Sequence, residues 1–162
     1  MKNIVTLLVF ICAFFSMSNA QKVVSGSAAN ITSYKTSNIV FDYSNIAIGH
    51  KKLSLEQQLK ADSRFAKYFQ KDKEKSERYF TGSVDDELEK YIKFIPDGSE
   101  DITLNILLIS MNDDFENVRL EAVFTDKNGT ELLHIVEVKD EDFNDAGHTL
   151  GKFIRKQIKH LK

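Results

Sequence analysis

Four histidines are the side chains in this sequence best suited to acid–base or metal chemistry near neutral pH. They are His50, His134, His148 and His160, and no two of them stand at the spacing of a metal-binding pair. One hypothesis is a hydrolase that uses His134 or His148 together with a nearby carboxylate. No Gly-x-Ser-x-Gly motif and no glycine-rich phosphate loop accompanies them. We therefore assign no catalytic residue and expect a structural role for both histidines.

A run of oxygen-bearing side chains, Asp140-x-Asp142-x-Asn144, resembles the opening of a calcium-binding loop. The pattern then fails, because Asp145 stands where the loop needs a glycine and Gly151 stands where it needs a bidentate glutamate. Acidic residues also favour the positive end of a helix. We interpret the run as the capped start of a helix and predict neither a metal site nor a cofactor.

Residues 1–20 have the composition of a cleaved signal peptide. Lys2 precedes an apolar run over 4–15, which is too short for a permanent membrane span. Ser18 and Ala20 then provide the small residues that signal peptidase requires. Cys12, the only cysteine, lies within the apolar run and lacks the small preceding residues of a lipoprotein signal. We expect an exported periplasmic or extracellular protein, without lipid anchor, disulfide or membrane span after cleavage.

The formal net charge of −2 over 162 residues gives no general attraction to nucleic acid or to anionic membranes. The lysines and arginines between residues 60 and 75 are diluted by acidic residues, as on a solvated helix face. We predict no nucleic-acid partner.

Hydrophobic periodicity predicts one α+β domain over residues 38–162, preceded by a mobile leader over 21–37. Ser54 begins a capping box, and Pro96-Asp97-Gly98 is a predicted turn. The expected elements are a strand over 38–48, helices over 55–70 and 83–95, strands over 102–109, 118–125 and 132–138, and a last helix after 142. The order β-α-α-β-β-β-α predicts a two-layer sandwich, with helices on one face of a four-stranded, mainly antiparallel sheet.

A two-residue turn at Asn128-Gly129 is predicted to fold residues 118–138 into a hairpin. Its register pairs Phe124 with Leu133 and Ala122 with Ile135 on the core face. The other face would carry more apolar side chains than a solvated surface usually has. The predicted binding residues on this face are Val123, Leu132, His134, Val136 and Val138.

Three local segments together resemble a group of small exported bacterial envelope proteins of unknown function. They are Phe41-Asp42-Tyr43-Ser44, Asp126-Lys127-Asn128-Gly129, and Asp145-Ala146-Gly147 with Leu150-Gly151-Lys152-Phe153. The resemblance covers residues 38–162 and implies a fold and an exported location, but no activity. Lys139-Asp140-Glu141-Asp142 departs from the glycine-rich link that such proteins often have before the last helix.

These observations favour a non-catalytic binding or assembly module that acts through the open sheet face or through an edge strand. Its partner would be another protein or a second copy, unless the leader covers the face. The alternatives are the hydrolase above and a carrier of an apolar ligand held between the sheet and the helices.

Overall fold

The computed structural model describes residues 21–95 and 100–161. The signal peptide expected over residues 1–20 and the turn expected at Pro96-Asp97-Gly98 lie outside the described residues. The elements, in chain order, are β1 (Lys22–Gly26), the 3-10 helix η1 (Ala28–Ile31), β2 (Thr36–Asp42), β3 (Ala47–Ile48), α2 (Leu55–Ala61), α3 (Ser63–Leu88), β4 (Lys93–Phe94), β5 (Ile102–Met111), β6 (Glu116–Asp126), β7 (Glu131–Asp142) and α4 (Phe143–Lys159).

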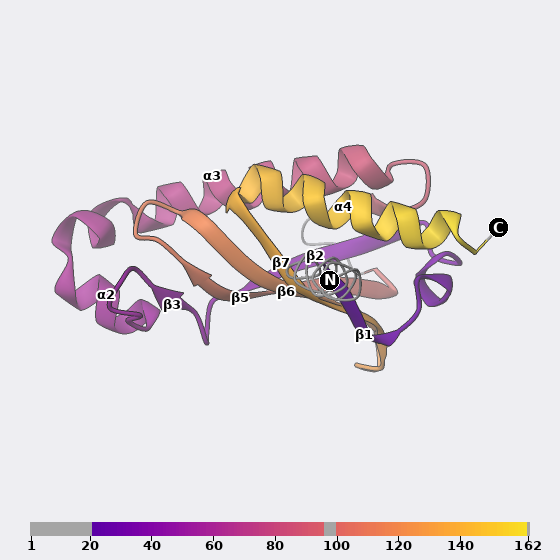
Figure 1. Cartoon of the computed structure of the whole chain (residues 1–162), viewed down its shortest axis with the longest axis horizontal. Helices are drawn as coiled ribbons and strands as arrows, with labels where there is room; N and C mark the ends of the chain where they lie inside the picture. The colour runs from indigo at the N-terminus through magenta and orange to yellow at the C-terminus, as the bar shows by residue number, and fades with distance from the viewer. Residues whose placement is uncertain (1–20, 96–99, 162) are drawn as a thin grey trace, which may run out of the picture.

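A seven-stranded mixed sheet forms one layer of the molecule. Six strands follow the order β1-β7-β6-β5-β2-β4, and β3 pairs with β5 further along the same edge as β2. The pairs among β1, β7, β6 and β5 are antiparallel, whereas β2 and β3 run parallel to β5 and β4 runs parallel to β2. Helices α3 and α4 lie side by side over one face of this sheet (Figure 1). The predicted α+β class is therefore confirmed.

The predicted four-stranded, mainly antiparallel sheet was wrong in strand number and in pairing. The predicted strand over 38–48 is divided into β2 and β3, and the structure adds β1 and β4. β4 has only two residues, and the five residues of β1 do not alternate between apolar and polar side chains. The segment 21–37, expected to be a mobile leader, contains β1, η1 and the start of β2. Its Ile31 is 1% exposed and belongs to the core. Pairing with β7 and burial of Ile31 order a segment whose composition alone suggested mobility.

The predicted helices over 55–70 and 83–95 differ from those in the structure in their bounds. The first is broken at Asp62, and its second part continues through 71–82 into the other, which ends at Leu88 rather than at residue 95. The Ser54 capping box is present, but α2 ends at Ala61, and Asp62 then caps α3 by accepting hydrogen bonds from Arg64 and Phe65. Helix α3 continues through the polar stretch over 71–78. Ser83, expected to cap a second helix, is instead buried within α3 and donates to Asn144 Oδ1 over 2.6 Å.

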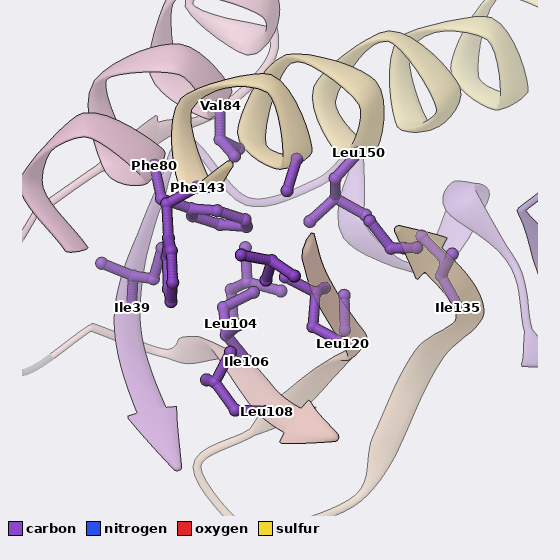
Figure 2. Close-up of a cluster of buried hydrophobic side chains, with 14 of the residues drawn as sticks. Ile39, Phe80, Val84, Leu104, Ile106, Leu108, Leu120, Ile135, Phe143 and Leu150 are labelled. Atoms are coloured by element: carbon purple, nitrogen blue, oxygen red, sulfur yellow. The ribbon is translucent and has the colours of Figure 1, made fainter. Parts of the chain in front are cut away.

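Apolar side chains from both layers form one core between the sheet and the helices (Figure 2). Each fully buried aliphatic or aromatic side chain there stabilises the fold by about 1.5–3 kcal/mol. Helix α4 packs closely on α3, because a Cβ atom at Gly147 would lie 2.6 Å from the Phe80 carbonyl oxygen, and one at Gly151 2.6 Å from Glu87 Cβ. The two glycines therefore permit close contact between the two helices.

Candidate functional site

One row of side chains crosses five neighbouring strands on the sheet face opposite the helices. Val40 of β2 pairs with Asn105 of β5, Asn105 with Val123 of β6, Val123 with His134 of β7, and His134 with Ser25 of β1. Neighbouring strands lie about 4.8 Å apart, so the row spans about 19 Å. This row is the centre of the outer face, the name used below for the sheet face turned away from α3 and α4.

The predicted hairpin register is confirmed at its centre. Phe124 pairs with Leu133 and Ala122 with Ile135 on the core side, and Val123 pairs with His134 on the outer face. Val123 is 9% exposed, although it belongs to the outer face. Its pairing partners, Asn105 and His134, flank it there and shield it.

Val136 also lies on the outer face and is partly exposed. The preceding residue, Ile135, is fully buried in the core, and successive side chains of a strand point to opposite faces. On its other side Val136 pairs with Lys22 of β1.

Two of the five predicted binding residues do not belong to the outer face. Val138 is 1% exposed in the core, because a bulge with Glu137 at φ 62° lets Leu120 pair with Val138 and so reverses the alternation. Leu132 lies at a second bulge and packs partly buried against the core. A bulge interrupts the alternation by which successive side chains of a strand point to opposite faces of the sheet. No local sequence signal marked either of the two bulges.

The turn between β6 and β7 also differs from the prediction. It contains three residues, Lys127 to Gly129, and only Gly129 has a positive φ, of 80°. The Asp126 carboxylate accepts hydrogen bonds from the backbone N–H groups of Asn128 and Thr130, which favours this wider turn. The bulge at Leu132 then restores the register that the longer turn had shifted, so the central pairs still form.

Sequence reasoning missed several apolar members of the outer face. The exposed fractions are 44% for Val40, 39% for Ile109 and 47% for Val24, and Leu107 is partly exposed beside them. Val40 and Leu107 come from β2 and β5, whose parallel pairing follows a long connection through α2, α3 and β4. Only the alternation within each strand could have indicated which side chains point outward.

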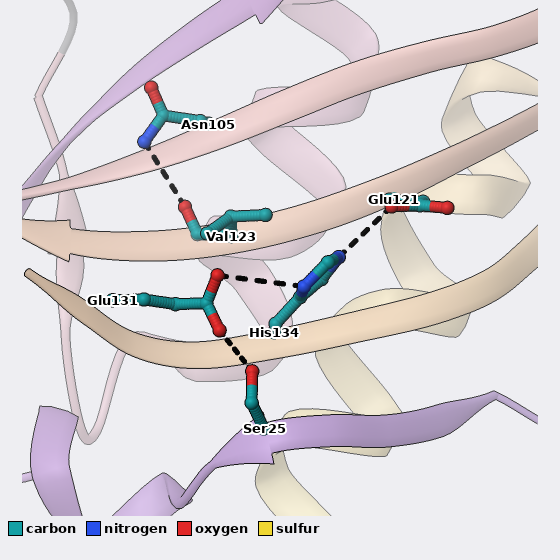
Figure 3. A network of polar contacts seen from close by, with 6 residues as sticks. All are labelled: Ser25, Asn105, Glu121, Val123, Glu131 and His134. Carbon is teal, nitrogen blue, oxygen red and sulfur yellow. Dashed lines mark hydrogen bonds and ion pairs between the residues drawn. The ribbon is translucent and has the colours of Figure 1, made fainter.

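His134 lies between two carboxylates on the outer face (Figure 3). Its Nε2 atom is 2.9 Å from Glu121 Oε2, and its Nδ1 atom is 3.6 Å from Glu131 Oε2. The Ser25 hydroxyl donates to the other oxygen of Glu131. The network therefore ties β1, β7 and β6 together through side chains, in addition to their backbone pairing.

This geometry favours a structural or binding role for His134 over nucleophilic catalysis. A serine hydrolase needs the imidazole in contact with the serine hydroxyl and oriented by one acid. Here the hydroxyl of Ser25 contacts Glu131, and both ring nitrogens of His134 face carboxylates. The imidazole is bound to Glu121 through Nε2, and the Ser25 hydroxyl is bound to Glu131 instead of to the imidazole.

A shallow hollow on the outer face combines apolar and acidic side chains. Val40, Leu107 and Val123 line it together with Glu131, His134 and the carboxylate of Asp42. The backbone N–H of Ser44 donates to Asp42 over 2.7 Å, and this bond, with a smaller contribution from the Ser44 hydroxyl, lowers the pKa of Asp42. Asp42 is therefore ionised at neutral pH, and the hollow has an anionic rim.

His148 lies elsewhere, at the contact between the two long helices. Its Nδ1 atom is 3.5 Å from Glu87 Oε1, and the second oxygen of Glu87 forms a 2.7 Å ion pair with Arg155. The side chain of Glu87 is only 12% exposed. These contacts fix α4 on α3, and they place no nucleophilic hydroxyl or thiol beside the imidazole.

The acidic run before the last helix acts as a helix cap. Asp142 accepts a hydrogen bond from the backbone of Asp145, and Asp140 accepts one from the hydroxyl of Thr149.

Within residues 21–95 and 100–161, no three His, Cys, Asp or Glu side chains are grouped so that they could hold a metal ion. In the same residues, no helix combines the length and hydropathy needed to cross a bilayer.

Comparisons with known proteins identify no family for this chain. No protein-family model and no curated protein matches the sequence. Among solved structures, a PelC dodecamer from Paraburkholderia phytofirmans matches at a TM-score of 0.41 and 9% sequence identity, over 86% of this chain and 97% of that one. At this level the likeness carries no argument about function, and the outer face has to be judged on its own geometry.

Proposed function

We propose that this protein is a non-catalytic binding or assembly module of the bacterial envelope that associates through the outer face. The observation that carries the proposal is the five-strand row, flanked by exposed valine and isoleucine side chains. Isolated exposed apolar residues are ordinary, whereas a group of them on one open sheet face is typical of an interaction surface.

The size of the outer face suits association with a second copy. The five strands have 5, 7, 10, 11 and 12 residues, so at about 3.3 Å per residue and about 4.8 Å between strands they cover roughly 570 Å². A stable protein interface buries about 800 Å² on each partner. The accessible area of the outer face is larger than the area of the flat sheet, because side chains project from it. Self-association through this face is the specific form of the proposal, and a different envelope protein is the alternative partner.

The test is to place a charge on the outer face and measure association of the purified protein by sedimentation. Val136→Glu and Val40→Glu should each weaken self-association at least about tenfold, because a buried unpaired carboxylate opposes the interface. Their thermal midpoints should change little, because both side chains are solvent-accessible in the isolated chain.

Two matched controls make this result interpretable. Leu161→Glu introduces the same charge at an apolar residue that is 51% exposed at the end of the chain, and it should leave association unchanged. Val138→Glu, two residues along β7 from Val136, should unfold the protein because Val138 is in the core. A protein that stays monomeric at all concentrations would contradict self-association, and a large stability loss in Val136→Glu would contradict the outward orientation.

The export expectation belongs to this proposal. N-terminal sequencing of protein recovered from the periplasm or medium should begin at Gln21. Recovery with Met1 intact from the cytoplasm would contradict it.

A further inference from the structure

A groove lies along one side of α3, away from the outer face. Its first part, of about 610 Å³, runs between the start of α3 and the turn that joins β5 to β6. Its second part, of about 230 Å³, continues past that turn to the junction of β7 with α4. Asp72, Asp114 and Phe115 line both parts, so the two hollows adjoin each other.

The floor of the groove is aromatic. Phe115 stacks on Phe65 with ring centroids 6.1 Å apart, and it also contacts Phe69 at 5.8 Å and Phe143 at 6.2 Å. Phe65, Phe115 and Phe143 are each less than 8% exposed, which makes the floor a rigid part of the core. The ring of the floor that a bound group can reach is that of Phe69, which is partly exposed.

Two exposed tyrosines stand at the two ends of the groove. Tyr68 lines the first part and Tyr79 lines the second, with exposed fractions of 43% and 49%. Eleven residues are about three helical turns, so both lie on the same side of α3, about 16 Å apart along its axis. Each ring already holds a cation of this chain, because Lys67 Nζ lies 5.1 Å from the Tyr68 centroid and Lys75 Nζ lies 5.6 Å from that of Tyr79.

The rim of the groove is strongly acidic. Among the residues that the structure describes, only Arg64 and Lys75 supply positive charge to the lining. Within the described part of the chain, none of the lining carboxylates forms an ion pair. These carboxylates are Asp62, Asp72, Asp113, Asp114, Glu116 and Asp142.

From this combination we infer that the groove binds a short extended segment of a partner protein that presents arginine side chains. A guanidinium group stacks on aromatic rings and pairs with carboxylates through two parallel hydrogen bonds, so it matches both the exposed rings of Tyr68 and Tyr79 and the acidic rim. An extended chain advances about 3.3 Å per residue, so the 16 Å between the tyrosines accommodates about five residues. An arginine near each end of such a segment reaches one part of the groove.

The inference is independent of association through the outer face and is tested separately. The probe is a blocked pentapeptide, Arg-Gly-Leu-Gly-Arg, titrated into the purified protein by calorimetry. Its twin with citrulline in place of both arginines keeps the shape and removes the charge. We expect saturable binding of the arginine peptide, a binding constant at least tenfold weaker for the citrulline peptide, and a loss of affinity as salt increases.

Variants locate the binding. Asp72→Asn combined with Asp114→Asn removes the two carboxylates that both parts share, and should weaken binding about tenfold or more. Asp86→Asn combined with Glu89→Gln changes the net charge equally near the other end of α3. This control pair should change the binding constant only slightly. Tyr68→Ser, at an exposed side chain, should weaken binding without lowering the thermal midpoint, and Val136→Glu should leave peptide binding intact.

Three results would overturn the inference. They are the absence of saturable binding of the arginine peptide to the wild-type protein at millimolar concentration, equal affinity for the citrulline peptide, and equal losses in the groove pair and the control pair. A fourth result would overturn the assignment of a guanidinium group. It is equal affinity for a peptide with lysine in place of both arginines, because the groove would then attract any cation.

Discussion

The turns that join β5 to β6 and β6 to β7 have the same backbone construction in opposite surroundings. In residues 112–116 and 126–130 alike, the first N–H donates to the fifth carbonyl, over 2.8 and 2.9 Å, and the fourth N–H donates back to the first carbonyl. The fourth residue is left-handed in both, with φ 65° at Phe115 and 80° at Gly129. One turn therefore uses glycine where the other uses a bulky aromatic residue.

The difference shows how tertiary contacts can replace local preference. A left-handed residue with a side chain costs about 1–2 kcal/mol, which Gly129 avoids at an exposed turn. Phe115 is 7% exposed and contacts three other rings. Burial of a phenylalanine contributes about 1.5–3 kcal/mol, and each aromatic pair adds about 0.5–1.5 kcal/mol, which outweighs the backbone strain.

The two turns also serve different surfaces. The β5–β6 turn forms the wall and floor of the acidic groove, whereas the β6–β7 turn leads into Glu131 of the outer face. Changes at Phe115 should therefore affect the core and the groove together. Changes at Gly129 or Asp126 should affect one exposed turn alone.

Phe115→Ala should produce the largest effect. It removes the ring contacts and keeps a side chain in the left-handed region, so the free energy of unfolding should fall by about 3–5 kcal/mol. Urea denaturation followed by circular dichroism measures this loss. A loss below about 1 kcal/mol would mean that the ring contributes little and that the proposed compensation is wrong.

Phe115→Gly, compared with Phe115→Ala, separates the contribution of the aromatic ring to stability from the cost of the left-handed backbone. Glycine adopts φ 65° without strain, so this variant should be more stable than Phe115→Ala by about 1 kcal/mol, although it has the smaller side chain. Parallel urea titrations of the two variants give the difference directly. If the alanine variant is the more stable, the left-handed backbone at this position is not strained.

Gly129→Ala should cost about 1 kcal/mol. No atom lies within 4 Å of the Cβ position there, so the whole cost is the left-handed backbone. Gly82, where the Cβ position in α3 is equally open and φ is not positive, provides the control. Gly82→Ala should stabilise the protein by up to about 1 kcal/mol, because alanine favours helix. Equal losses of stability in the two variants would show that the left-handed backbone at Gly129 is not the cause of the cost.

Asp126→Ala should give the smallest effect, and one that depends on pH. Hydrogen bonds to the Asp126 carboxylate, chiefly from the backbone of Thr130 with a further one from Asn128, lower its pKa in the folded state. The wild-type advantage should therefore be present above the unfolded pKa of about 3.9 and disappear as the pH falls through the lower folded value. Thermal midpoints of both proteins at pH 7 and at pH 2–3 measure this, and an advantage that grows in acid would contradict the sign.

The central hairpin shows how far sequence reasoning reached. The alternation over residues 118–135 predicted the pairing of Val123 with His134 correctly, because burial of Phe124 and Ala122 allows only one orientation of the strand. The predicted turn was one residue too short. The longer turn shifts the pairing by one residue, and the bulge at Leu132 shifts it back, so the central pairs agree with the prediction. Val138 was misplaced because the bulge at Glu137 has no local sequence signature.

The groove was not predictable in the same way. Asp72 occurs in a stretch whose composition indicated only a solvated helix face, and Asp113 and Asp114 lie far from it in the sequence. Their proximity depends on how α3 lies against the β5–β6 turn. The aromatic floor likewise assembles Phe65, Phe115 and Phe143 from three separate elements.

The amino-acid pattern by itself determined the α+β class, the Ser54 cap, the principal hairpin register and the start of the last helix, since each follows from short-range periodicity and capping chemistry. Only the tertiary structure decided the parallel pairing of β2 with β5, the addition of β1 to the sheet edge and the contact of the two glycines in α4 with α3. These features join residues far apart in the chain, and long-range packing is a property of the whole fold that no window of sequence contains.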